Sequence, residues 1–76
     1  MALVENITPL KLGRDVDHRS VECTFDVITN TDGERFLQLD TYGSSERKLQ
    51  GKKSQSLRLS PSALQQLKQI IQTHKL

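Results

Sequence analysis

Residues 57–71 read LRLSPSALQQLKQII, and this stretch marks the point where a strand gives way to a helix. Ser60 is a favoured N-cap residue, and Pro61 suits the first helical position because its missing N–H would have no partner there. Apolar residues then recur at helical spacing and predict a helix over about 61–74 with one apolar stripe. The stripe comprises Ala63, Leu64, Leu67, Ile70 and Ile71.

Strands are predicted before this helix because apolar and polar residues alternate there with the period of two that a half-buried strand shows. Residues 55–59 have this pattern over a short length. Residues 19–29 show it most clearly, since four apolar residues alternate with polar ones: Val21, Cys23, Phe25 and Val27. Cys23 is accordingly expected to be a buried, small apolar side chain.

A tight turn is predicted between residues 19–29 and the next strand, residues 34–42. Asp32 and Gly33 lie at its centre, and Gly33 is free to adopt a positive φ. Two strands joined by a short Asp-Gly loop are typical of an antiparallel hairpin. Within the second strand, alternation places Leu37 and Leu39 on one face and four residues on the other: Phe36, Gln38, Asp40 and Tyr42.

The fold class predicted by this order is α+β, with four strands followed by one helix in a single domain over residues 1–76. The first strand is expected within residues 4–12, where Pro9 restricts it to an edge of the sheet.

The core of so short a chain is expected to be small, because 76 residues bury only about 60% of their unfolded surface. Such chains usually need a disulfide, a metal or a partner. A single cysteine rules out an internal disulfide, so we expect a homodimer formed through the helix. The predicted interface comprises Leu64, Leu67, Ile70 and Ile71. The alternative is one helix lying flat on its own sheet, which accounts for the same stripe.

Charge is distributed unevenly along the chain. Residues 1–42 carry four basic and eight acidic side chains, whereas residues 43–76 carry seven basic side chains and one acidic side chain. This asymmetry predicts an anionic partner for one side of the molecule. No apolar run approaches the ~20 residues needed to cross a bilayer, so we expect a cytoplasmic protein with no membrane partner.

A cluster of basic residues precedes the helix in a stretch without acids: Arg47, Lys48, Lys52, Lys53 and Arg58. Lysine and arginine side chains bind phosphate oxygens and release counterions, which makes the affinity depend on salt. The stretch 43–54 is predicted to be a loop because it holds two glycines and three serines. The alternative is that these side chains are only solvated and keep the protein soluble.

Aromatic residues near this loop favour nucleic acid over other anions. Phe36 and Tyr42 lie on the strand face opposite the leucines, so at least one ring is expected on the outside of the sheet. Exposed rings beside basic side chains stack unpaired bases, which predicts a single-stranded ligand. For Phe36, packing under the N-terminal segment or in a dimer contact is an equal alternative.

No catalytic or metal-binding constellation is apparent in the sequence. His18 and His74 are far apart and lack cysteines or carboxylates at ligand spacing, so no metal site or cofactor is expected. The serines have no histidine and acid in a suitable order, and Gly51-Lys52-Lys53-Ser54 lacks the upstream glycine of a phosphate-binding loop. We therefore expect no enzyme and no small-molecule substrate.

Several features occur in a fixed order over residues 19–71: Tyr42, then Gly51-Lys52-Lys53, then Leu57-Arg58-Leu59-Ser60-Pro61, then Gln66-Leu67-Lys68 with Ile70-Ile71. This order resembles the positive cofactor four family of transcriptional coactivators and its bacterial and phage relatives. The chain departs from that family at Gln50, where a proline is favoured, and at Ser54-Gln55-Ser56, which lengthens the step into the last strand.

The resemblance implies a curved four-stranded antiparallel sheet followed by one helix, and a homodimer formed through the helices. It further implies binding of single-stranded or melted DNA with little sequence preference, in transcription, replication, recombination or repair. Carried over by position, it implies DNA contacts at Lys52, Lys53 and Tyr42, with Arg58 as a further candidate. Arg47 and Lys48 fall in the variable linker and are proposed from their charge alone.

Two other functions fit the same residues. One is a protein-interaction module whose helix pairs with a partner helix, the basic loop being only solvated. The other is an RNA binder that uses the same surface, because stacking does not distinguish the sugars without a contact to the 2′-hydroxyl.

A bacterial or phage source would place the protein with the nucleoid.

Overall fold

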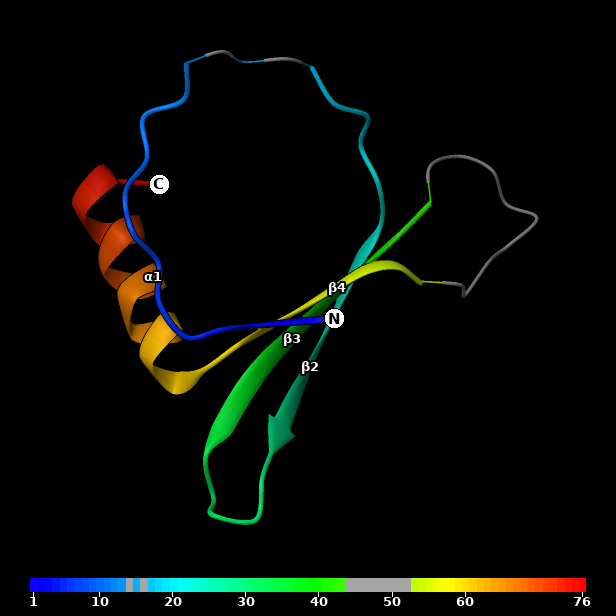
Figure 1. Ribbon diagram of the computed structural model, residues 1–76, viewed down its shortest axis with the longest axis vertical. Helices are drawn as coiled ribbons and strands as arrows, with labels where there is room; N and C mark the ends of the chain where they lie inside the picture. The colour runs from blue at the N-terminus through cyan, green and yellow to red at the C-terminus, as the bar shows by residue number, and fades with distance from the viewer. Residues whose placement is uncertain (14, 16, 44–52) are drawn as a thin grey trace.

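The computed structural model describes residues 1–13, 15, 17–43 and 53–76 and shows a four-stranded sheet followed by one helix (Figure 1). The elements are β1 (Ala2–Val4), β2 (Cys23–Thr29), β3 (Arg35–Tyr42), β4 (Lys53–Leu59) and α1 (Pro61–His74). The predicted α+β class and the order of four strands and a helix are confirmed. Within the part of the chain described, no helix has both the length and the apolar character needed to span a membrane.

The sheet is mixed, with the strand order β1-β4-β3-β2. β3 runs antiparallel to both β2 and β4, whereas β1 runs parallel to β4. The prediction of a fully antiparallel sheet is therefore wrong at this edge. The predicted range of the first strand, 4–12, is wrong as well, because pairing ends at Val4 and the chain then leaves the sheet to run beside α1 (Figure 1).

The β2–β3 hairpin forms as predicted, and its turn is organised by one side chain. Asn30 Oδ1 accepts hydrogen bonds of 2.9 Å from the backbone N–H groups of Asp32 and Glu34. The Asn30 backbone N–H donates to the Glu34 carbonyl oxygen at 3.0 Å, and Gly33 adopts a φ of 84°. Glycine takes this left-handed conformation without steric cost, so the Asp-Gly pair closes the hairpin.

The two faces of the sheet differ in composition, as the alternation along 34–42 predicts. The strand register aligns one set of side chains, here called the apolar face: Phe25, Val27, Leu37, Leu39, Leu57 and Leu59. It aligns a second set on the other side, here called the polar face: Thr24, Asp26, Gln38, Asp40, Ser56 and Arg58. Neighbouring strands thus reinforce the period-two pattern of each strand.

The apolar face is only partly covered within one chain. α1 packs against β3 and β4, where Leu59 and Ala63 are buried. β2 lies at the sheet edge, and Phe25 remains 72% exposed and Val27 44% exposed. The expectation that Cys23 is buried is wrong, because this side chain is also exposed. The alternation predicts the face on which these side chains lie, but a single helix is too narrow to cover the edge strand.

α1 begins and ends as its sequence predicts. The Ser60 hydroxyl accepts a 3.1 Å hydrogen bond from the Ala63 backbone N–H, and Pro61 occupies the first turn. Lys75 ends the helix in a left-handed conformation. Its N–H donates to the Gln72 carbonyl oxygen at 3.3 Å, and the Leu76 N–H donates to the Ile71 carbonyl oxygen at 3.0 Å. The predicted helix over 61–74 is therefore confirmed.

A glutamine of α1 binds the chain that follows β1. The Gln66 amide accepts a hydrogen bond from the Ile7 backbone N–H and donates one of 2.8 Å to Asn6 Oδ1. In Figure 1 the N-terminal segment runs alongside α1 before it arcs across to β2. Both ends of one side-chain amide thus hold this segment against the helix.

Candidate nucleic-acid interface

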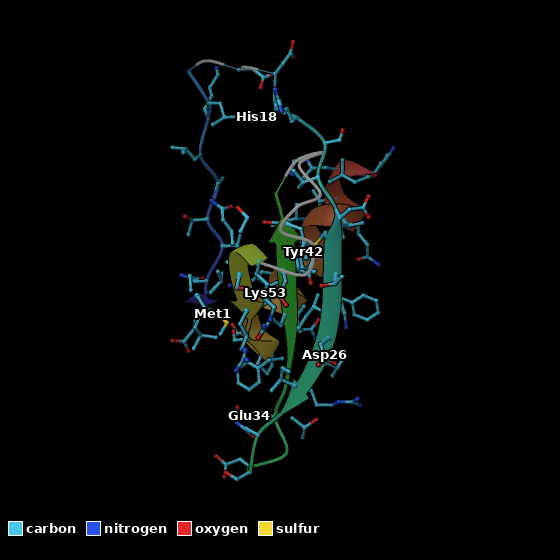
Figure 2. The ribbon with its side chains drawn as sticks, turned by 90° about the vertical axis from the view of Figure 1, so that its right-hand side faces the viewer. Met1, His18, Asp26, Glu34, Tyr42 and Lys53 are labelled. Carbon is cyan, nitrogen blue, oxygen red and sulfur yellow. The ribbon has the colours of Figure 1, made fainter. Side chains whose placement is uncertain are left out.

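Lys53 and Tyr42 are brought opposite each other by an irregularity between β3 and β4. The pairing is regular as far as Thr41 and then skips one residue of β4, so that Tyr42 pairs with Lys53. A bulge of this kind redirects a side chain relative to the regular alternation. The Lys53 Nζ consequently reaches Asp40 Oδ2 on the polar face, at 3.3 Å. Figure 2 shows Lys53 and Tyr42 close together, away from the hairpin loop that carries Glu34.

Asp40 lies at the centre of the polar face and is only 7% exposed. The Ser56 hydroxyl donates a 2.6 Å hydrogen bond to its Oδ1, and Gln38 Nε2 donates to both carboxylate oxygens at 3.2 and 3.3 Å. Ser56 above all, and then Gln38 and Lys53, lower the pKa of Asp40, while burial acts in the opposite direction. The carboxylate is therefore charged at neutral pH and fixed by three neighbours.

Gln38 connects this carboxylate to Arg58. The Gln38 Oε1 accepts hydrogen bonds from Arg58 Nε at 3.1 Å and from Arg58 Nη2. Gln38 is 9% exposed, and its Nε2 atom donates to Asp40 Oδ1. A continuous chain of contacts therefore crosses β3 and β4. We call it the polar row, and it consists of Arg58, Gln38, Asp40, Ser56 and Lys53.

Tyr42 adds an aromatic ring at one end of the polar row. Its hydroxyl lies 2.8 Å from Thr24 Oγ1, in a hydrogen bond that joins β3 to β2. The Tyr42 side chain is half-buried, and the hydrogen bond to Thr24 restrains its ring. A ring held in this way stacks a flat ligand without first losing its own rotational freedom.

Three of the six predicted nucleic-acid contacts lie on the polar face, with Lys53 opposite Tyr42 and Arg58 farther along β4. The other three, Arg47, Lys48 and Lys52, lie outside the described residues.

Sequence reasoning missed Gln38, Asp40 and Ser56 as parts of the site. The alternation along 34–42 already placed Gln38 and Asp40 on the face of Tyr42. Their contacts with Ser56 and Arg58 depend on the β3–β4 register, which composition does not determine.

The charges on the described polar face are balanced. Lys53 and Arg58 supply two positive charges, while Asp26 and Asp40 supply two negative charges. Gln38 takes two of the five N–H donors of Arg58, and no other contact to this guanidinium is found within the described residues. The remaining donors point away from Gln38 and can bind an acceptor such as a phosphate oxygen.

The predicted dimer residues of α1 are incompletely covered. Leu64, Leu67 and Ile70 are half-buried, and Ile71 is 42% exposed. His18 and His74 are both exposed. Among the residues described, no three His, Cys, Asp or Glu side chains lie close enough to hold a metal ion.

No protein-family model, curated protein or solved structure matches this chain.

Proposed function

We propose that this protein is a dimeric single-stranded DNA-binding protein with little sequence preference. The observation that carries the proposal is the placement of Tyr42, Lys53 and Arg58 on one sheet face, with both cations anchored by the polar row. An aromatic platform beside fixed cations suits unpaired bases and their phosphates. The resemblance to the positive cofactor four family suggests the same ligand from the order of sequence motifs.

Affinity is expected to come from stacking and from a small number of phosphate contacts. The polar face itself has no net charge, because Asp26 and Asp40 offset Lys53 and Arg58. Binding that depends on charge alone would therefore be weak at this face. The basic residues that precede β4 in the sequence, Arg47, Lys48 and Lys52, would supply additional charge. A duplex would offer no unstacked base to Tyr42.

The large surface of the single chain supports a homodimer. A compact monomer of 8.6 kDa is expected to expose about 4,700 Å². This chain exposes 6831 Å². The excess, on the order of 2,000 Å², falls in the range that each chain of an obligate dimer buries. Part of the excess lies in the segment between β1 and β2, whose described residues form no strand or helix.

The extended shape and the small core of the single chain also support a homodimer. The radius of gyration is 14.7 Å, whereas a compact chain of this length has about 11 Å. No large side chain is fully buried in the described part of the chain. A second copy is the proposed cover for the exposed Ile71 of α1 and Phe25 of β2, because each chain then supplies the apolar surface that the other needs.

The proposal is tested by titrating labelled oligo-dT, oligo-U and a duplex of the same length at two salt concentrations, with the molecular mass measured alongside. We expect a dimer that binds oligo-dT more tightly than the duplex and loses affinity as salt rises. Equal affinity for single strands and duplex, or no binding in dilute salt, would contradict the proposal. Tighter binding of oligo-U would instead favour RNA.

Dimerisation through α1 is tested separately by exchanging one residue. Ile71→Lys places a charge on the proposed interface and is expected to give a monomer or an unfolded chain. Gln72→Lys adds the same charge at the neighbouring exposed position and is the matched control. If Ile71→Lys remains a folded dimer in sedimentation, the interface does not include this part of the helix.

A further inference from the structure

A hollow of about 360 Å³ lies at the opposite end of the polar face from Tyr42. It is lined by Met1, Leu3, Ile28, Asn30, Phe36 and Arg58. The register explains how distant residues meet there, because Ile28 pairs with Phe36 and Leu3 pairs with Arg58. Phe36 precedes Gln38 by two residues on the same face, so the hollow continues directly from the polar row.

The lining is apolar except at Asn30 and Arg58, and of these two only Arg58 is charged. The Asn30 amide oxygen accepts from Asp32 and Glu34 within the hairpin turn, and its Nδ2 donates one hydrogen bond of 2.9 Å to Glu34 Oε1. Arg58 has N–H donors beyond those that bind Gln38. The hollow therefore combines one aromatic ring, aliphatic walls and one positively charged donor.

A flat, largely apolar group joined to an anion fits this combination. An unpaired nucleobase can stack on the Phe36 ring while its phosphate accepts hydrogen bonds from Arg58. The hollow lies at the small end of the range for ligand pockets, which suits one base rather than a base pair. An apolar segment of a protein partner would desolvate the Arg58 guanidinium and leave the donors that do not bind Gln38 without an acceptor.

We infer that Phe36 and Arg58 form a second stacking subsite for an unpaired nucleobase. This inference rests on the proposed function and extends it. Phe36 and Tyr42 are six residues apart on one face of β3, which separates them by about 20 Å. The bound strand consequently runs along β3, with one base at Tyr42, another at Phe36 and phosphates at Lys53 and Arg58 between them.

The role of the Phe36 ring is tested by a substitution that keeps the side chain apolar but removes the ring. Phe36→Leu is expected to weaken oligo-dT binding roughly tenfold, the size of effect given by losing one stacked base. Leu10→Ala removes an apolar side chain that is 83% exposed and lies outside the sheet, and it is the control. An abasic strand has phosphates but no bases, so Phe36→Leu should leave its binding unchanged. Lys53→Gln should weaken the binding of both oligo-dT and the abasic strand.

A second variant keeps the ring and reports on the stacking directly. The chain contains no tryptophan, so Phe36→Trp introduces a single fluorophore at the hollow. Saturating oligo-dT is expected to quench it, while the abasic strand and the Leu10→Trp control should show little change. Equal oligo-dT binding by Phe36→Leu and Leu10→Ala, with no quenching of Phe36→Trp, would overturn the subsite.

The outcomes also separate this inference from the function on which it rests. If the unchanged protein binds no oligo-dT, the proposed function and the subsite are both wrong. If the protein binds but its affinity is insensitive to Phe36, only the subsite is wrong. A change in Phe36→Trp fluorescence that follows protein concentration without DNA would mean that a second copy covers the hollow, and the subsite would again be rejected.

Discussion

Ser56 on β4 donates a 2.6 Å hydrogen bond to Asp40 on β3, and this contact fixes the only nearly buried carboxylate of the described polar face. Neither residue contacts the proposed ligand directly. They hold Lys53 and, through Gln38, Arg58 in place. The Asp40 carboxylate thus positions the two cations of the site, although the proposed ligand is itself an anion.

The first prediction concerns stability and pH. The lowered pKa of Asp40 means that the unfolded chain binds its proton more readily than the folded chain. The charged carboxylate therefore stabilises the fold fully above the usual aspartate value of ~3.9, and this contribution is lost as pH falls through the lower folded value. Asp40→Asn should be less stable than the unchanged protein at pH 7, with the difference shrinking below about pH 4.

Urea unfolding at several pH values and one fixed protein concentration measures this difference. Asp32→Asn, in the exposed hairpin turn, is the control and should change the free energy of unfolding by less than about 0.5 kcal/mol. A constant difference between Asp40→Asn and the unchanged protein from pH 7 to pH 3 would mean that the contacts of Asp40 do not favour its charged form.

The second prediction concerns the salt dependence of DNA binding. Lys53→Gln removes one phosphate contact, so the slope of log affinity against log salt should become shallower by about 0.7 for a single strand. Lys68→Gln removes an exposed charge from α1 and should leave the slope unchanged. Equal slopes for the two variants would show that Lys53 makes no phosphate contact.

The third prediction concerns the helix cap. Ser60→Ala leaves the Ala63 backbone N–H without its side-chain acceptor, at a position only 5% exposed. The expected loss is about 1 kcal/mol in the free energy of unfolding, measured by urea titration. Ser62→Ala changes an exposed residue in the first turn of α1 and should leave the free energy of unfolding nearly unchanged. If the two variants lose equal stability, the cap contributes nothing specific.

The fourth prediction concerns the segment that follows β1. Gln66→Ala removes both hydrogen bonds that hold Asn6 and Ile7 against α1. Amide hydrogen exchange at Ile7 should accelerate, while exchange in the β2–β3 hairpin stays the same. Gln65→Ala changes a neighbouring exposed side chain and is the control. Unchanged exchange at Ile7 would show that other contacts hold this segment.

Local signals in the sequence predicted the local structure well. The cap at Ser60 and Pro61 located the helix, and the Asp-Gly turn located the hairpin, because both depend on residues adjacent in the chain. Alternation also assigned the two faces of β3. Each of these features is determined by backbone preferences and by a period that a single segment carries on its own.

Long-range features could not be predicted in the same way. The parallel pairing of β1 with β4 joins segments far apart in the chain, and three residues are too few for a clear pattern. The exposure of Cys23 follows from the width of α1, which the alternation in β2 does not encode. The bulge that redirects Lys53 is likewise a property of two strands and their register.

The pairing of Ala2 with Leu57 has a consequence for the order in which the protein assembles. The β2–β3 hairpin can form as soon as residue 42 is available, whereas β1 has no partner until residues 57–59 have been synthesised. Closing so long a loop is entropically costly and slow compared with local turns. We therefore expect β1 to dock after the hairpin has formed, so that a nascent chain on the ribosome carries the hairpin while residues 2–4 are still unpaired.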